Sequence, residues 1–160
     1  MPRRVIGITL GDSAGIGPEI VRVAIDGGKL DADFDYRVIG DASGATPGQP
    51  TPASAKAALD ALEESARLAL AGEICAVVTG PVSKARMHEV GFAFPGQTEF
   101  FADRWRTPNH AMCLTGGSLT VALVTAHVPL KDVRLSAPEI MRVGELLADF
   151  LTLRLGRTVA

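Results

Sequence analysis

The stretch AKAALDALEESARLALAGEICAVVT, residues 55–79, places a helix directly before a strand. Apolar side chains recur at helical spacing up to Ala71, and we expect one apolar stripe made of Leu59, Leu62, Ala66 and Leu70. Gly72 ends this helix. The run Ile74–Thr79 is almost entirely apolar and contains β-branched residues, which predicts a strand buried on both faces. A helix followed by such a strand is typical of a mainly parallel sheet in an α/β layer fold.

The preceding residues show the same alternation of strand and helix. Val5–Thr9 predicts a first strand, and a helix is expected to begin near Pro18, whose fixed φ suits a first helical turn. The pair Gly27-Gly28 ends that helix. Tyr36–Ile39 predicts a second strand, and residues 42–54, rich in Gly, Pro, Ser and Thr, predict a loop. The expected fold class is therefore α/β.

The second half of the chain has a different pattern. Two apolar runs, His110–Thr115 and Thr120–Ala126, are joined by Gly116-Gly117-Ser118, which predicts a hairpin. The segment Ser136-Ala-Pro-Glu139 then has the spacing of a capping box and predicts the start of a final helix. The apolar face expected for that helix consists of Ile140, Val143, Leu147, Phe150 and Leu151.

The composition is that of a soluble globular protein, with 47% apolar and 21% charged residues. A net charge of −2 gives no sign of a nucleic-acid or membrane-surface partner. No apolar run approaches the roughly 18 residues of a membrane span. Cys75 and Cys113 lie in apolar runs, so we expect buried thiols in a reducing compartment. Gly11 and Asp12 interrupt the first apolar stretch, so we expect no signal peptide and a cytoplasmic location.

Residues 92–101, FAFPGQTEFF, combine a Pro-Gly turn, polar groups and flanking aromatic side chains just before an apparent helix start at Thr98. A helix N-terminus presents free backbone N–H groups, so Gln97 and Thr98 could meet a polar or anionic ligand there. The alternative is a surface turn followed by a helix capped by Thr98, with Phe100 and Phe101 buried. The local sequence leaves both interpretations open.

Three further features carry possible chemistry. The turn at residues 9–20 is rich in glycine but lacks the G-x-G-x-x-G spacing, which favours a structural or site-lining role over cofactor binding. Residues 79–84 follow the strand and predict a helix opening at Pro81, where Lys84 either attracts an anion or is simply solvated. His127 follows an apolar run and is either a metal ligand or a core residue; one histidine alone cannot make a metal site.

Four sequence motifs follow one another along this chain, and their order is informative. They are GDSAGIGPEI at 11–20, TGPVSK at 79–84, FPGQTEF at 94–100 and AHVPL at 126–130. Together they resemble the 4-hydroxythreonine-4-phosphate dehydrogenase family of vitamin B6 biosynthesis. The resemblance implies a fold like that of the isocitrate and isopropylmalate dehydrogenases, with two α/β domains and a cleft completed at a homodimer interface. Residues 1–90 would form the first domain and residues 91–160 the start of the second, which binds metal and substrate.

The resemblance also implies an activity. It is the NAD-dependent oxidation, with decarboxylation, of 4-phosphooxy-L-threonine, a small phosphorylated hydroxy-amino acid, assisted by a divalent metal ion such as Zn, Mg or Co. His127 matches one of three metal-binding histidines, and Thr98 matches a substrate-binding threonine. Gln97 stands where the family has a substrate-binding histidine; it can form hydrogen bonds but cannot carry a positive charge. Oxidation of a related hydroxy acid or dihydrodiol therefore stays open.

The resemblance covers only the N-terminal half of the family's pattern. We expect the other two metal histidines, the basic phosphate-binding residues, most of the NAD site and the segment that closes the first domain to lie beyond Ala160. The 160 residues alone are then expected not to turn over substrate. A non-catalytic α/β domain that binds an anion or a partner is the alternative from a different class.

Overall fold

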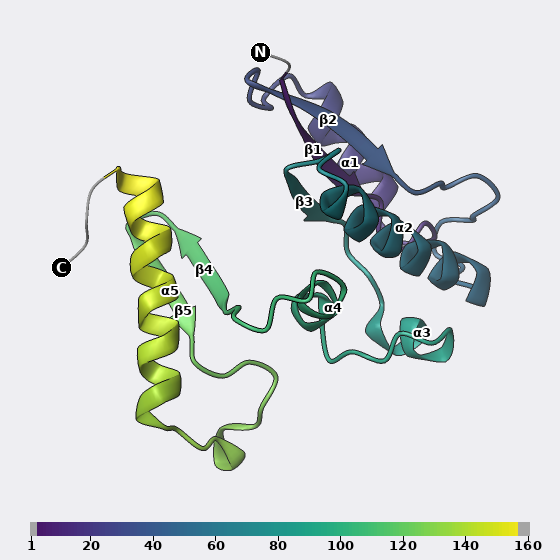
Figure 1. The fold of residues 1–160 in the computed structure, drawn as a ribbon. Coiled ribbons are helices and arrows are strands. Elements are labelled where there is room, and N and C mark those ends of the chain that lie inside the picture. The colour runs from purple at the N-terminus through teal and green to yellow at the C-terminus, as the bar shows by residue number, and fades with distance from the viewer. Residues whose placement is uncertain (1–2, 157–160) are drawn as a thin grey trace. The chain divides into compact units, whose positions relative to one another are not determined.

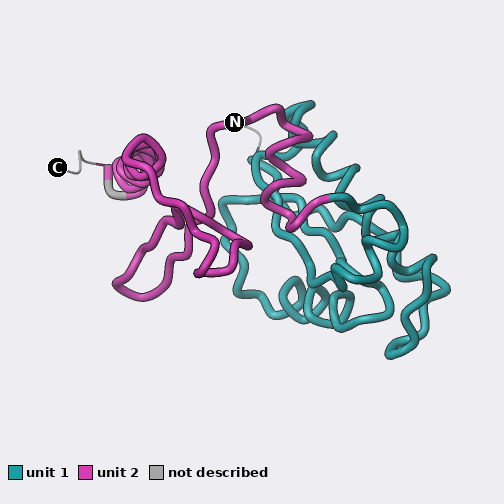
Figure 2. Tube along the Cα trace, turned by 90° about the horizontal axis from the view of Figure 1, so that it is seen from below, with its two compact units in different colours: residues 1–93 teal, residues 94–160 magenta. Residues whose placement is uncertain are grey.

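The computed structural model describes residues 3–156. The chain forms two compact units, Met1–Ala93 and Phe94–Ala160, which Figure 2 shows in teal and magenta. Each unit has its own sheet, and each is described here by itself.

The first unit is a three-stranded parallel sheet in the order β2-β1-β3, with helices in the connections (Figure 1). Its elements in chain order are β1 Arg4–Thr9, α1 Gly17–Asp26, β2 Phe34–Ile39, α2 Pro52–Leu70, β3 Ala76–Thr79 and α3 Lys84–Glu89. In the register of the sheet, Ile8 lies opposite Val38 on one side and Val78 on the other. The predicted parallel α/β arrangement is confirmed, as is the helix expected to begin near Pro18, which starts at Gly17 and is followed by its C-cap Gly27.

The core of this unit lies between α2 and the sheet. The buried face of α2 is made mostly of small side chains: Ser54, Ala55, Ala58, Ala61, Leu62, Ser65, Ala66 and Leu68. Ala61 and Leu68 pack with Ile39 and Ile74 from the sheet side. Small residues let the helix backbone come close to the strands, and the Ser65 hydroxyl donates to the Leu62 carbonyl at 2.8 Å. The buried polar group is therefore satisfied within the helix.

The expected stripe on α2 is only partly right. Leu62 and Ala66 are buried, but Leu70 is 64% exposed, and Leu68, outside the predicted stripe, is fully buried. The face of α2 that meets the sheet is centred nearer to Ala61 and Leu68 than the predicted stripe is. The contact with the strands decides which face of the helix is buried, and the positions of its largest side chains do not.

The helix α2 also begins earlier than expected, at Pro52, so the loop predicted over 42–54 ends sooner. Thr51 and Ser54 form a reciprocal capping box: each side chain accepts a hydrogen bond from the other residue's backbone N–H at 3.1 Å. With proline at the first helical position, this cap stabilises three more residues in the helix.

The prediction that Ile74–Thr79 is buried on both faces is wrong. β3 lies at the edge of the described sheet, and Val78 is 52% exposed. Val77 packs against the cluster under α2, whereas Val78 points to the opposite face, which the described elements leave open at this strand. The expectation of buried thiols is also wrong, since Cys75 and Cys113 are both exposed.

The second unit consists of a helix, a hairpin and a long final helix. Its elements in chain order are α4 Gln97–Arg104, β4 Met112–Gly116, β5 Leu119–Leu123, a 3-10 turn Leu130–Asp132 and α5 Ala137–Leu155. β4 and β5 are antiparallel and joined by Gly117-Ser118, which confirms the hairpin. Gly117 has φ +55°, the left-handed conformation that tight hairpin turns require.

The helix α5 begins as predicted, because the Ser136 side chain accepts a hydrogen bond from the Glu139 backbone N–H at 3.4 Å. Its expected apolar face is only partly buried. Val143 is 3% exposed, but Ile140 and Phe150 are exposed. Within the described second unit, α5 packs on a sheet of only two strands, which cannot cover the whole face. None of the helices within residues 3–156 is both long and apolar enough to cross a membrane.

The position of the buried face of α2 can be tested with two leucines of the same helix. We expect Leu62→Ala to lower the free energy of unfolding by about 2–5 kcal/mol, because it empties a fully buried site. Leu70→Ala removes an exposed side chain and should change it by less than about 0.5 kcal/mol. Urea unfolding followed by circular dichroism measures both. Equal losses for the two variants would contradict this assignment of the core.

Candidate functional site

Two sequence motifs meet in the first unit, at the carboxyl ends of β1 and β3. The Gly80 N–H donates to the Thr9 carbonyl at 2.9 Å, and the Asp12 N–H donates to the Pro81 carbonyl at 2.9 Å. Gly11 has φ +72°, and a Cβ built on it would lie 2.3 Å from the Pro81 oxygen. The glycine-rich turn therefore packs directly on the turn after β3, and Gly11 permits this close approach, as a structural or site-lining role requires.

The sequence predicted a helix opening at Pro81 after β3, and this prediction is wrong. α3 begins at Lys84, with Ser83 as its N-cap. The Pro81 carbonyl accepts a hydrogen bond from the Asp12 N–H of the other turn, and the chain stays non-helical through Ser83. Lys84 is exposed at the first position of a short helix. The described structure supplies no anion-binding partner for it, and the solvated interpretation suffices.

In the second unit, α4 begins at Gln97, one residue before the start expected at Thr98. Its N-cap is Gly96, with extended backbone and no side chain to cap the helix. Thr98 is thus the second helical residue, and the prediction that it caps the helix is wrong. Phe100 and Phe101 are buried, as predicted. Because no side chain caps α4, the backbone N–H groups of its first turn keep their capacity to bind a ligand, with Gln97 and Thr98 beside them.

His127 lies against the first turn of α4. Its Nε2 atom is 4.0 Å from Oε2 of Glu99, and its side chain is 34% exposed. A Cβ on Gly96 would lie 2.8 Å from the same Nε2 atom, so any other residue at this position would require the ring to shift. His127 itself has φ +61°, a conformation uncommon outside glycine. The fold thereby brings the predicted metal ligand next to the helix turn that carries both predicted substrate contacts.

A polar cavity of about 120 Å³ adjoins this turn within the second unit. Its polar lining consists of Thr98, Glu99, His110 and Arg142. The Arg142 guanidinium is held in place, since it donates to the His110 carbonyl at 2.9 Å and to Glu139 Oε2 at 2.9 Å. Gln97 is not among the lining residues, so the two predicted substrate contacts face different surroundings.

Sequence reasoning missed three residues of this site: Gly96, Glu99 and Arg142. Glu99 had a readable signal, since it stands three residues after Gly96, the spacing of a carboxylate in the first turn of a helix. Arg142 had none, because its partners Asn109 and His110 are more than thirty residues away in sequence.

The described residues contain no group of three or more His, Cys, Asp or Glu side chains that could hold a metal ion. The other two histidines have local partners elsewhere: His88 Nδ1 contacts the Phe92 carbonyl, and His110 Nδ1 contacts the Thr107 carbonyl. His127 is thus a single candidate metal ligand, with one carboxylate beside it. An imidazole with a neighbouring carboxylate suits a divalent metal, but holding one firmly takes further ligands.

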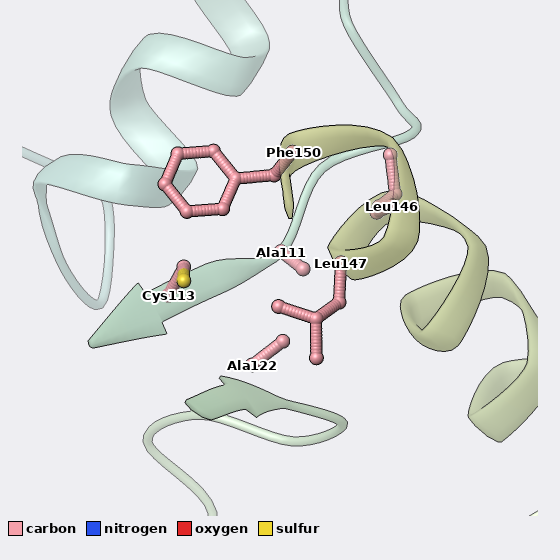
Figure 3. Close-up of a pocket in the computed structure, with 6 residues that line it drawn as sticks. All are labelled: Ala111, Cys113, Ala122, Leu146, Leu147 and Phe150. Carbon is pink, nitrogen blue, oxygen red and sulfur yellow. The ribbon is translucent and has the colours of Figure 1, made fainter. Parts of the chain in front are cut away.

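A second cavity, of about 200 Å³, lies between the hairpin and α5. Figure 3 shows Leu146, Leu147 and Phe150 of α5 facing Ala111, Cys113 and Ala122. No charged side chain lines it, so it offers apolar contact and no acid–base chemistry.

Comparison with known proteins agrees with this architecture. Solved structures of 4-hydroxythreonine-4-phosphate dehydrogenase from Klebsiella pneumoniae and of a putative one from Salmonella typhimurium match with TM-scores of 0.71 and 0.73, at 25% and 23% identity. The matches include 92% and 94% of the residues of this chain, and 59% and 60% of the residues of the two solved chains. The α/β fold class predicted from the sequence is thus confirmed as that of these dehydrogenases, here in part.

The sequence comparisons identify the family. The model of the family "Pyridoxal phosphate biosynthetic protein PdxA" matches residues 19–158, and the chain belongs to this family. A 4-hydroxythreonine-4-phosphate dehydrogenase from Desulforapulum autotrophicum is 33% identical over 198 aligned residues, covering 96% of this chain and 58% of the relative. The enzyme of that name from Zymomonas mobilis is 35% identical, with 80% and 50% covered. The chain thus spans about half the length of these curated relatives, and the resemblance recognised from its motifs is confirmed.

The steric role of the glycine-rich turn can be tested with two glycines that share one backbone conformation. Gly11 and Gly72 have φ of +72° and +71°, but a Cβ on Gly72 would meet no atom within 4 Å. Gly72→Ala should cost about 1–2 kcal/mol for the left-handed backbone alone. Gly11→Ala should cost a further 1–3 kcal/mol or so, from the clash with Pro81. Thermal unfolding measures both, and equal losses would show that the close contact contributes nothing.

Proposed function

We propose that this chain forms the part of a 4-hydroxythreonine-4-phosphate dehydrogenase that supplies one metal ligand and two substrate contacts. The observation that carries the proposal is the placement of His127 against the first turn of α4, which holds Gln97 and Thr98, in a chain of the PdxA family. Residues 1–90 would be the first α/β domain, without its closing segment, and residues 91–160 the start of the metal- and substrate-binding domain. The active assembly would be a cytoplasmic homodimer.

The residues of the site have distinct roles in this proposal. His127 would hold a divalent metal together with ligands from outside the described residues. Thr98 would donate its hydroxyl hydrogen to the substrate, and Gln97 would donate from its side-chain amide. The free N–H groups at the start of α4 would add favourable interactions with a negatively charged group of the substrate. When bound, the metal would supply electrophilic assistance to alcohol oxidation and NAD would accept the hydride.

A second candidate function is favoured by Gln97. An amide at this position offers hydrogen bonds without positive charge, which suits a hydroxy acid or a dihydrodiol that lacks a phosphate group. This alternative keeps the same metal ligand and cofactor and changes only the substrate class.

The residue at position 97 separates the two candidates. If the substrate is 4-phosphooxy-L-threonine, Gln97→His should tighten its binding by up to about tenfold near pH 6, because a charged imidazole adds a charge-assisted hydrogen bond to the phosphate. Isothermal titration calorimetry measures the Kd. Gln49→His, in an exposed loop, is the matched control and should leave the Kd unchanged. An unchanged Kd for Gln97→His, with tighter binding of an unphosphorylated hydroxy acid to the wild type, would favour the second candidate.

We further propose that the 160 residues do not turn over substrate by themselves, because the described part holds no group of three side chains that could bind a metal ion beside His127. With 4-phosphooxy-L-threonine, NAD and Zn²⁺, the purified chain should form no measurable NADH, while Zn²⁺ should still perturb the NMR signals of His127. His88→Ala is the control for unspecific metal binding. NADH formation above the background of the His127→Ala variant would overturn the proposed inactivity.

A further inference from the structure

Glu99 has a carboxylate oxygen whose surroundings call for explanation. Its Oε2 atom is buried, and within the described structure it accepts no hydrogen bond. An acceptor left unpaired in the protein interior costs about 1–3 kcal/mol, and more if it is charged. Such a group calls for a partner: a bound ion, an ordered water molecule or a neighbouring side chain that moves toward it.

The side chain that faces this oxygen is the imidazole of His127. Nε2 and Oε2 are 4.0 Å apart, which is too long for a hydrogen bond but within reach of a small rotation of either side chain. A Cβ on Gly96 would lie 2.8 Å from Nε2 and 3.0 Å from Oε2, so any other residue at position 96 would displace one or both side-chain ends from this contact. His127 also keeps a backbone φ of +61° at this point. Three features of the fold therefore converge on one contact.

We propose that Glu99 is a positioning residue for His127: it accepts the Nε2–H hydrogen, and so leaves the Nδ1 lone pair free as the metal ligand. The metal role rests on the function proposed above, whereas the orientation of the ring does not. Histidines that bind metals usually donate their other N–H to a carboxylate, a carbonyl or water, and this contact selects the tautomer and the ring orientation. Loss of such a partner typically weakens metal binding by 10–100-fold.

A purely structural role for Glu99 is the competing interpretation. A carboxylate in the first turn of a helix interacts favourably with the helix dipole wherever its oxygens point. That role predicts a loss of helix stability on substitution but no change in the His127 ring. The two interpretations therefore differ in the tautomer of one imidazole.

The test is a long-range ¹H–¹⁵N NMR spectrum of the histidine rings in the metal-free 160-residue chain, at about pH 9, where imidazoles are neutral. In the wild type, we expect His127 to show a single tautomer with the proton on Nε2. Glu99→Ala should lose this pattern and give averaged ring signals. Glu99→Gln retains an acceptor oxygen and should restore it. Asp103→Asn, an exposed carboxylate on the same helix, should leave the ring unchanged.

Two results would overturn the inference: averaged His127 ring signals in the wild type, or the same single tautomer in Glu99→Ala. Backbone amide spectra of each variant show whether the fold is kept, and the tautomer of the wild type decides the matter if Glu99→Ala does not fold. A Zn²⁺ titration then tests the metal role, with the apparent Kd at His127 expected to be at least about tenfold weaker in Glu99→Ala. Zn²⁺ that leaves the wild-type His127 signals unchanged would contradict the proposed function, while the tautomer result would still stand on its own.

Discussion

The first unit depends on one backbone contact, in which the turn after β1 hydrogen-bonds to the turn after β3. Asp12 donates to the Pro81 carbonyl, and Gly80 donates to Thr9. The contact brings the carboxyl ends of two parallel strands together, where α/β sheets usually place their ligands. It also holds the turn that precedes α3, which begins at Lys84. The same contact requires a residue without Cβ at position 11, so the glycine at this position follows from packing.

In the second unit, too, a glycine allows a close approach, here between a side chain and a helix. The missing Cβ of Gly96 allows the His127 ring to approach the first turn of α4, so residues thirty positions apart in sequence share one site. An uncapped helix start, a histidine with left-handed backbone and a buried carboxylate oxygen each cost free energy. Their concentration in one place distinguishes this turn from an ordinary helix start and supports a binding role for it.

Local signals in the sequence predicted well wherever the physics is local. The hairpin turn at Gly117-Ser118, the Ser136 cap and the start of α1 next to Pro18 each depend on one or two residues and their own backbone. Predictions that depended on which other segment of the chain packs against a residue were less successful. Leu70 was expected in the core and is exposed, and Thr98 was expected to cap α4 but lies inside the helix. An apolar pattern says that a segment can be buried, whereas the element packed against it decides which side is.

The sequence by itself determined the α/β class, the family and the identity of His127, Gln97 and Thr98 as candidate site residues, because these depend on residue type, spacing and order along the chain. Only the tertiary structure decided that β3 is an edge strand, that Cys75 is exposed and that Glu99 faces His127. The physical reason is that exposure and contact are properties of pairs of segments distant in sequence. They depend on where glycines let backbones meet, and no single segment carries that information.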